Sequence, residues 1–334
     1  MHTNTQPAQT PKHRAVLVTG GAGYIGSHMV RVLLDAGHQV VVLDDLSSGH
    51  AETIPPGVTF VKGDIRSRDL VTALLRDHEV SAVFHFASRI QVGESVRDPR
   101  LYWRDNLAAS IELLESVLDA KVSRFVLSST AAVYGDPIRV PIDEDHPTVP
   151  VNPYGATKLA LEHVLASYSR AYGLKYAALR YFNASGADVA TGLGERHDPE
   201  THLIPLVLDA ALGRRALTVF GEDYATDDGT CVRDYVHVND LADAHLAALA
   251  YLDGGGESGA FNLGTGHGHS VRQVIACAEK ITGRSVAVTI GPRREGDPPV
   301  LVASPERAKK VLGWAPKRAS LHDIVSDAWQ SHRK

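Results

Sequence analysis

The stretch Ala15-Val-Leu-Val-Thr-Gly-Gly-Ala-Gly-Tyr-Ile-Gly26 decides the fold of this chain. Its first five residues are apolar or β-branched, which is typical of a buried parallel strand. Gly20, Gly23 and Gly26 permit a tight turn, a close approach of the backbone to a pyrophosphate, and close packing of the following helix. That helix, predicted at Ile25–Ala36, would direct the free N–H groups of its first turn at the phosphates. A simple glycine turn is the alternative, but the strand before it and the helix after it favour a dinucleotide-binding loop.

Outward from this loop, short β-branched runs alternate with amphipathic segments. The runs that predict buried strands are Ala15–Thr19, Val40–Leu43, Val58–Val61, Ala82–Phe86, Phe125–Ser128 and Tyr176–Leu179. Helical spacing of apolar residues marks Ile25–Ala36, Asp69–Arg76, Leu107–Leu118 and Pro153–Tyr172. This alternation predicts an α/β fold, a Rossmann-type doubly wound parallel sheet.

The second half of the chain is less regular and predicts a smaller C-terminal α/β substrate domain. Gly- and Asp-rich stretches interrupt it at 221–229 and 254–259, and 291–299 has the composition of a loop. We expect a disordered tail at 1–13, a nucleotide-binding domain at 14–181 plus about 234–263, and a substrate domain at 182–233 plus about 264–330.

Composition narrows the class of protein. The 334 residues carry a net charge of −5 with a pI near 6.4, which makes nucleic acid and anionic membranes poor partners. No apolar run reaches the length of a membrane span, and the polar N-terminus does not have the pattern of a signal peptide. The two cysteines, Cys231 and Cys277, have neither metal-type nor redox-type spacing, so we expect a reducing, cytoplasmic compartment.

His197 and His202 form the one histidine pair that suggests a metal site. Pro199 lies between them and argues against a single helix that presents both rings. We therefore expect a polar loop here and no metal.

Acidic residues after the second and third strands indicate which dinucleotide binds. Asp44 and Asp45 end the second strand about 20 residues after the glycine loop, where a carboxylate bonds the adenosine ribose. A carboxylate there repels a 2′-phosphate, so the sequence predicts NAD rather than NADP. Asp64, in Gly63-Asp-Ile65, is expected at the adenine edge, or as a helix N-cap, or as both.

Tyr154 and Lys158 lie four residues apart and so share one helical face. Asn152 and Pro153 are suited to the cap and first position of that helix. An ammonium about 5 Å from a phenol contributes roughly 3 kcal/mol, which lowers the phenol's pKa of about 10 by about two units. The pair therefore predicts a tyrosine that acts as general base near neutral pH.

The preceding predicted strand ends in three hydroxyl residues, Ser128, Ser129 and Thr130. Because ligands bind at the carboxyl ends of such strands, the hydroxyl of Thr130 would bond a reacting oxygen. A polar strand exit is the alternative interpretation.

These residues together resemble the extended short-chain dehydrogenase/reductase family, and within it the UDP-hexose 4-epimerases. The resemblance extends from about Arg14 to Trp314. Besides the glycine loop it rests on His85-Phe-Ala87, Gly93-Glu-Ser95, Ser129-Thr-Ala-Ala-Val-Tyr134, Tyr154-Gly-Ala-Thr-Lys158, Arg180-Tyr-Phe-Asn183, Val219-Phe-Gly221, Arg233-Asp-Tyr-Val-His237 and Arg293-Arg-Glu-Gly-Asp297. Such a series in order is far more specific than any single motif.

The resemblance implies roles by position. The catalytic residues would be Thr130, Tyr154 and Lys158. The NAD contacts would be Gly20, Gly23, Tyr24, Ile25, Gly26, Asp44, Asp45, Ser48, Asp64, Ile65, Phe86, Ala87, Asn106, Ser128, Tyr154, Lys158 and Tyr181. The UDP-sugar contacts would be Thr130, Tyr154, Asn183, His202, Leu203, Thr218, Phe220, Arg233, Tyr235, Arg294, Asp297 and Leu301. Arginine suits a diphosphate because its planar fork binds two oxygens, although Arg233 could instead pair with Asp234 on the surface.

Three positions depart from the family pattern or leave it open. Ile90 stands where some relatives have a lysine near the cofactor. His202 stands where an asparagine is frequent, so its role is open. Leu301 is intermediate between the aromatic residue associated with plain hexoses and the small residue associated with N-acetylated ones, so it leaves acceptance of UDP-N-acetylhexosamines undecided.

The reaction implied is interconversion of UDP-glucose and UDP-galactose by transient oxidation at C4, rotation of the 4-keto sugar and return of the hydride. Net redox is zero, so one NAD stays bound throughout. UDP-uronates and UDP-pentoses are alternative substrates. A nucleotide-sugar dehydratase would need an acid where Ala131 and Ala132 stand, and a silent NAD-binding regulator would be expected to lack Tyr154 or Lys158.

The resemblance also implies a homodimer. Leu107–Leu118 and Pro153–Tyr172 are the helices that would form its interface. Their apolar faces could equally belong to the core.

Overall fold

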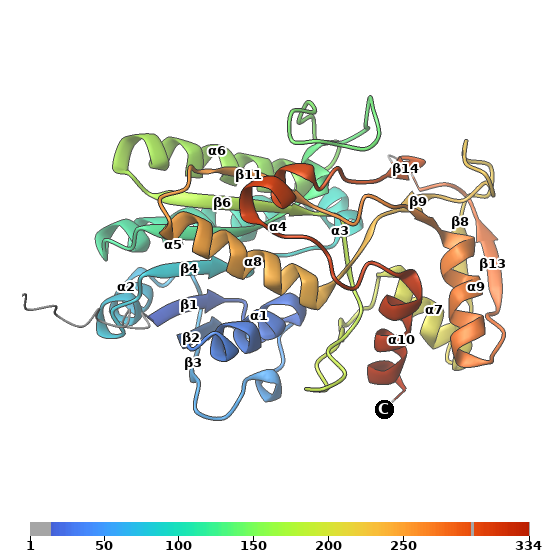
Figure 1. Ribbon diagram of the computed structural model, residues 1–334, viewed down its shortest axis with the longest axis horizontal. Coiled ribbons are helices and arrows are strands. Elements are labelled where there is room, and N and C mark those ends of the chain that lie inside the picture. The colour runs from blue at the N-terminus through green and yellow to red at the C-terminus, as the bar shows by residue number, and fades with distance from the viewer. Residues whose placement is uncertain (1–14, 295–296, 334) are drawn as a thin grey trace, which may run out of the picture.

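The structure, a computed structural model, describes residues 15–294 and 297–333. The tail expected at 1–13 lies outside the described residues, as does Glu295-Gly296 of the expected 291–299 loop. The longest dimension of the molecule lies horizontally in Figure 1, with the sheet of the first half on the left and the smaller unit of the second half on the right.

A seven-stranded parallel sheet forms the centre of the larger unit, which confirms the predicted Rossmann-type fold. Its spatial order is β11-β6-β5-β4-β1-β2-β3, and every neighbouring pair is parallel. The strands are β1 (Ala15–Thr19), β2 (Gln39–Asp44), β3 (Thr59–Lys62), β4 (Ala82–His85), β5 (Arg124–Thr130), β6 (Lys175–Tyr181) and β11 (Gly259–Leu263). The chain order reverses between β1 and β4, so the connections that follow these two strands go to opposite faces of the sheet and leave a crevice for a ligand at the strand ends.

Helices cover both faces of the sheet (Figure 1). One face carries α1 (Tyr24–Asp35) and α8 (Val238–Asp253), and the other carries α2 (Arg68–Asp77), α5 (Ala109–Asp119) and α6 (Pro153–Tyr172). Successive residues of a strand point to opposite faces. Val16 and Val18 of β1 accordingly pack under α1 and α8, whereas Leu17 packs under α2 and α5.

Between β4 and β5 the structure differs from the predicted single helix at Leu107–Leu118. Three short segments precede α5: α3 (Val92–Arg97), α4 (Pro99–Tyr102) and the π-helical segment η2 (Trp103–Ala108). The side chain of Asp98 caps α4 by accepting from the N–H of Leu101 at 3.2 Å. Apolar periodicity predicts a helix from its buried stripe of residues. The three segments before α5 are short and largely exposed, so the sequence pattern did not predict them.

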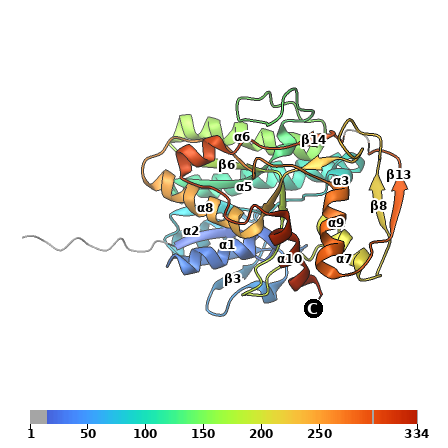
Figure 2. The same cartoon turned by 45° about the vertical axis from the view of Figure 1, so that its right-hand side comes forward.

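The second half adds the smaller α/β unit that the sequence predicted (Figure 2). Its helices are α7 (Leu203–Ala211), α9 (Val271–Thr282) and α10 (Leu321–His332), and β8 (Leu217–Phe220) pairs with β13 (Val288–Gly291). Short strands join the halves: β7 (Asn183–Ser185) pairs with β10 (Tyr235–His237), and β9 (Val232–Arg233) lies between β12 (His269–Ser270) and β14 (Val300–Leu301). The remaining helical segments are η1 (Ala51–Thr53), η3 (Ala131–Val133) and η4 (Ala308–Leu312).

The segment 234–263 leaves the smaller unit and returns to the large sheet. In it α8 packs along α1, and β11 adds a strand beside β6. Among the described helices, none combines the length and the apolar character needed to cross a bilayer.

Candidate active site

The glycine loop has the close packing that the sequence predicted. Gly20 has a φ of +71°, and a Cβ there would lie 2.6 Å from the backbone nitrogen of Ala87 at the end of β4. A Cβ on Gly26 would lie 2.1 Å from the carbonyl oxygen of Gly20. Neither position therefore accepts any larger residue without movement of the backbone.

The first turn of α1 fits a pyrophosphate. Gly23 is its N-cap and has no side chain with which to satisfy the first N–H groups of the helix. These donors and the positive end of the helix dipole lie beside the crevice between β1 and β4. A Cβ at Gly26 would fill the same turn, so glycine keeps it open. The loop therefore has both the space and the N–H donors that a dinucleotide needs.

The two aspartates at the end of β2 have different surroundings. Asp44 is buried, and its carboxylate accepts from the N–H groups of Ala22 at 2.9 Å and Leu46 at 2.8 Å. Burial raises the pKa of Asp44, while these two hydrogen bonds oppose the rise. Asp45 is exposed and accepts from the N–H of Ser47 at 2.8 Å. Asp44 thus ties the glycine loop to β2.

Asp64 is not a helix N-cap, contrary to one of its two predicted roles. The N-cap of α2 is Ser67. Asp64 accepts from the N–H of Arg66 at 2.8 Å and pairs with the guanidinium of the same residue. The pairing lowers the pKa of Asp64. Three residues of turn separate Asp64 from the helix, which is too far for a cap.

Three side chains predicted to contact the cofactor lie in η2 and near the carboxyl ends of β5 and β6. Asn106 is buried, and both ends of its amide bond the backbone of Arg89, with Oδ1 accepting from N–H at 2.8 Å and Nδ2 donating to the carbonyl at 3.0 Å. It therefore fixes the loop that follows β4. The hydroxyls of Ser128 and Tyr181 hydrogen-bond each other across neighbouring strands β5 and β6.

Tyr154 lies in the first turn of α6, as predicted. The side chain of Asn152 caps this helix by accepting from the N–H of Gly155 at 2.9 Å, and Pro153 occupies its first turn. The ring of Tyr154 contacts that of Tyr102 edge to face, with centroids 6.4 Å apart. The hydroxyl of Thr130, at the end of β5, lies within hydrogen-bonding reach of the phenol.

Lys158 is 2% exposed and its Nζ donates to the carbonyl oxygen of Ser128 at 2.9 Å. Burial lowers the pKa of Lys158 to about 7, and the carboxylate of Glu162 opposes this shift. The ammonium is therefore only partly populated near neutral pH.

The pKa of Tyr154 differs from the expected value: it is raised rather than lowered. Burial of the phenol is the largest cause, and the hydrogen bond with Thr130 opposes it only in part. A fully charged lysine beside the phenol would lower the pKa of Tyr154. In the structure the lysine is itself desolvated, so its charge does not offset the burial of the phenol.

Behind the lysine lies a buried polar network that sequence reasoning missed. Glu162 pairs with Arg180, whose Nε lies 3.0 Å from Oε1, and accepts from the hydroxyl of Ser129 at 2.5 Å. Arg180 also donates to the hydroxyl of Tyr134 at 2.9 Å. The spacing of Lys158 and Glu162, four residues apart on α6, was the available signal.

Arg233 does not pair with Asp234, so the alternative reading of that arginine is wrong. It forms an ion pair with Asp297 instead. Asp234 is fully buried, and its carboxylate accepts from the N–H and hydroxyl of Thr265 at 2.9 and 2.7 Å. We expected Arg233 to contact the diphosphate and Asp297 to contact a ribose of the same substrate. The structure brings these two residues together.

The remaining predicted substrate residues come from several short elements. Arg294 stacks over the ring of Phe220 at 4.1 Å, which places a cation beside an aromatic wall. Asn183 donates through Nδ2 to the carbonyl oxygen of Asp234 at 3.0 Å. Leu301, in β14, packs with the cluster that contains Ala131 and Tyr134.

Other predicted residues have structural contacts of their own. Tyr24 donates its hydroxyl to the carbonyl oxygen of Gly186 at 2.7 Å, and burial raises its pKa. Thr218 lies on β8, and its Oγ1 is 3.2 Å from the Oγ1 of Thr289. Leu203 begins α7, and Tyr235 is buried in the core of the smaller unit. These predicted residues therefore come from both units: Tyr24 from the larger one, and Leu203, Thr218 and Tyr235 from the smaller one.

A dinucleotide loop at a topological switch point, with a tyrosine and a lysine at the neighbouring strand end, defines an NAD-dependent enzyme with a tyrosine acid–base group. A family model described as "NAD dependent epimerase/dehydratase family" matches residues 16–264. The chain belongs to this family, which confirms the predicted family and its NAD cofactor.

Individual relatives agree over nearly the whole length. The chain is 50% identical to the UDP-glucose 4-epimerase of Halalkalibacterium halodurans and 52% identical to that of Azospirillum brasilense, over 96% of this chain and 96% and 92% of those proteins. Among solved structures, it resembles the UDP-glucose 4-epimerase of Brucella ovis in complex with NAD, with a TM-score of 0.92 and 47% identity over 95% of this chain and 97% of that one. The Bifidobacterium longum enzyme in complex with NAD+ and UDP gives a TM-score of 0.90 at 37% identity, over 96% and 98% of the chains.

Proposed function

We propose that this protein interconverts UDP-glucose and UDP-galactose by inverting the configuration at C4. The observation that carries the proposal is the position of Tyr154, which lies in the first turn of α6 with Thr130 at the end of β5 on one side and the buried Lys158 one turn further along. The relatives named UDP-glucose 4-epimerase at about half identity support the choice of substrate.

In the proposed reaction Tyr154 takes the proton from the C4 hydroxyl and later returns it. Bound NAD supplies the acceptor and the donor of the C4 hydride. Thr130 donates to, or accepts from, the same sugar oxygen, so it holds O4 against the phenol. Burial keeps bulk water from competing for the proton but favours the neutral phenol, so Tyr154 needs a nearby positive charge to act as a base.

Lys158 is the positive charge that the chain itself supplies. Glu162 raises the pKa of Lys158 against the effect of burial, and thereby increases the fraction of ammonium beside the tyrosine. Arg180 compensates the charge of Glu162, and the hydrogen bond to the carbonyl oxygen of Ser128 orients Nζ. The network behind the lysine therefore supports the acid–base group without contacting the sugar.

The diphosphate would lie between the two units. Arg233 and Arg294 are the cations available there, and Asp297 would bond a ribose hydroxyl. Because Arg233 pairs with Asp297 in the structure, substrate phosphates would compete with that carboxylate for the guanidinium. Leu203 and Phe220 are the proposed walls of the uracil pocket.

C4 epimerisation of another UDP-sugar is the second candidate. Leu301 is half-buried against Ala131 and Tyr134, and its side chain is neither as large as an aromatic one nor as small as that of glycine. A dehydratase is disfavoured, because Ala131 and Ala132 follow Thr130 and carry no acid.

The domain division, the assembly and the compartment are further parts of the proposal. We propose an NAD-binding domain at 14–181 plus about 234–263 and a UDP-sugar-binding domain at 182–233 plus about 264–330. We propose a homodimer built on α5 and α6, where the side chain of Ile111 is only partly covered. The free thiols Cys231 and Cys277 support a cytoplasmic location.

The test is incubation of the purified protein with UDP-galactose and no added cofactor, with products followed by NMR. UDP-glucose without net formation of NADH is expected. If UDP-galactose is unchanged while a UDP-uronate, UDP-pentose or UDP-N-acetylhexosamine is epimerised, the second candidate replaces the first.

A further inference from the structure

Four side chains with metal-ligating atoms meet in the loop between β7 and α7. They are Glu195, His197, Glu200 and His202, and one ligand atom from each lies within 4.8 Å of the other three. Pro199 prevents a single helix from presenting both histidine rings. In the structure no helix is needed, because the loop turns back and brings the two ring centroids within 5.2 Å.

The donor atoms of the cluster lie close to one another. Nδ1 of His197 lies 3.0 Å from a carboxylate oxygen of Glu195 and 3.8 Å from one of Glu200. Nδ1 of His202 lies 2.6 Å and 3.3 Å from the same two carboxylates. Ligands bound tetrahedrally to zinc at about 2.0–2.1 Å are separated from one another by about 3.3 Å. The separations between the histidine and glutamate donors lie on both sides of this value, so one ion would bind all four donors after the side chains shift.

The orientation of the donors supports the same conclusion. Nδ1 of His202 points into the cluster, where it lies between the carboxylates of Glu195 and Glu200, and this atom is inaccessible to solvent. The carboxylate side chain of Glu195 is only 6% exposed. Glu200 is held by its own loop, since Oε1 accepts from the N–H groups of Thr201 at 2.7 Å and His202 at 2.8 Å. Such support is typical of the groups that surround a metal ligand.

We propose that Glu195, His197, Glu200 and His202 bind one zinc ion. Two imidazoles and two carboxylates are a donor set that suits zinc, whereas magnesium and calcium prefer sites made of oxygen alone. The charges also balance, because two carboxylates neutralise a dication between two neutral rings.

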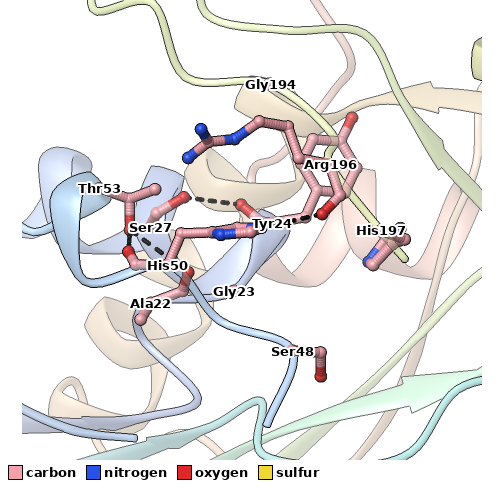
Figure 3. Close-up of a pocket in the computed structure, with 10 residues that line it drawn as sticks. All are labelled: Ala22, Gly23, Tyr24, Ser27, Ser48, His50, Thr53, Gly194, Arg196 and His197. Atoms are coloured by element: carbon pink, nitrogen blue, oxygen red, sulfur yellow. Dashed lines mark hydrogen bonds between the residues drawn. The ribbon is translucent and has the colours of Figure 1, made fainter. Parts of the chain in front are cut away.

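The ion would fix the loop over the nucleotide-binding turn. Tyr24, in the first turn of α1, donates to the carbonyl of Gly186 at 2.7 Å, and its ring meets that of His197 edge to face. Nε2 of His50 lies 3.0 Å from the carbonyl oxygen of Arg196 (Figure 3). A cavity of about 640 Å³, lined in part by Glu195, His197 and Glu200, gives an ion access from the other side. The proposed role is structural and does not depend on which sugar the enzyme accepts.

The test uses tag-free, full-length protein, because a histidine tag would bind zinc by itself. The protein is stripped with a chelator and titrated with Zn²⁺ by calorimetry, and its melting temperature is measured with and without the ion. Binding of one ion per chain with a rise in Tm is expected. Co²⁺ in place of Zn²⁺ should give the strong visible absorption of a tetrahedral site.

Two variants and a control make the result specific. His197→Ala and Glu200→Gln should each lose the stoichiometric binding, the Tm rise and the cobalt spectrum. His322→Ala removes an exposed imidazole that lies 3.4 Å from a carboxylate oxygen of Asp323, and it should retain all three. Circular dichroism identifies a variant that has failed to fold, and the chelator experiment on the unmodified protein then decides alone. Absence of stoichiometric binding, or equal binding by the unmodified protein and His197→Ala, would overturn the proposal and leave an ion-pair cluster.

Discussion

Tyr154 is the residue on which the proposed chemistry depends most directly. Removal of its hydroxyl in Tyr154→Phe should lower kcat by about 10²–10⁴-fold, the usual contribution of a positioned acid–base group. The circular dichroism spectrum should be unchanged, because the variant keeps the ring beside Tyr102 and loses only the hydroxyl that faces Thr130. The measurement is the rate of UDP-galactose conversion by NMR.

Tyr172→Phe is the matched control, since Tyr172 is 64% exposed at the end of the same helix. It should retain full activity. Turnover by Tyr154→Phe equal to that of the control would remove Tyr154 from the mechanism and revive the idea of a regulator.

Lys158 gives a prediction for the dependence of stability on pH. Its pKa is about 7 in the folded protein and about 10.4 in an unfolded chain. Between these two pKa values the lysine is protonated in the unfolded chain but neutral in the folded protein. Its contribution to the free energy of unfolding therefore rises with pH across this window and is constant below it. The difference in this free energy between the native protein and Lys158→Met should therefore increase from pH 7 to pH 10.

Urea denaturation at several pH values, on NAD-free protein, measures that difference. All other titrating groups are common to the two proteins and cancel to first order. A difference that stays constant, or falls, over the window would mean that Lys158 keeps its proton in the folded state.

At the scale of the element, α6 depends on the buried pair Glu162–Arg180. Glu162→Gln leaves the guanidinium of Arg180 buried without its counter-charge, which costs about 3–5 kcal/mol in typical cases. Replacement of both residues in Glu162→Gln/Arg180→Met should restore part of the lost stability. Glu112→Gln, on the exposed side of α5, is the control and should change stability by less than about 0.5 kcal/mol.

The first turn of α1 gives a second prediction at this scale. Gly26→Ala puts a Cβ 2.1 Å from the carbonyl oxygen of Gly20, so the turn must open. The variant should be purified with much less NAD than the native protein, as measured by absorbance after acid release. Gly259→Ala, where a Cβ meets nothing within 4 Å, should retain its NAD. Equal NAD content in the two variants would contradict the assigned role of the loop.

At the scale of the whole molecule, the proposed homodimer predicts a particle of twice the chain mass of 35.9 kDa. Ile111→Arg, on the partly exposed side of α5, should shift the protein to monomer, because a charge would be buried at the interface. Val149→Arg is the control, since Val149 is 64% exposed in a loop outside α5 and α6. Sedimentation equilibrium distinguishes the two masses, and a monomeric native protein would contradict the proposal.

The sequence alone determined the order of strands and helices in the first half and the identity of the nucleotide loop. It could do so because the strands of a doubly wound sheet are buried on both faces, and because Gly20 and Gly26 occupy positions that exclude every side chain. Tyr154 and Lys158 were recognisable for a similar reason, since four residues along a helix fix a shared face.

Only the tertiary structure decided the surroundings that set the chemistry. Arg233 pairs with Asp297 rather than with its neighbour in sequence, and the pKa of Tyr154 rises because burial outweighs a lysine that is itself desolvated. The rings of His197 and His202 lie together because the loop folds back on itself, and no periodic sequence pattern predicts such a fold. Sequence patterns report local geometry and burial, whereas pairing, desolvation and the meeting of distant loops depend on how the whole chain packs.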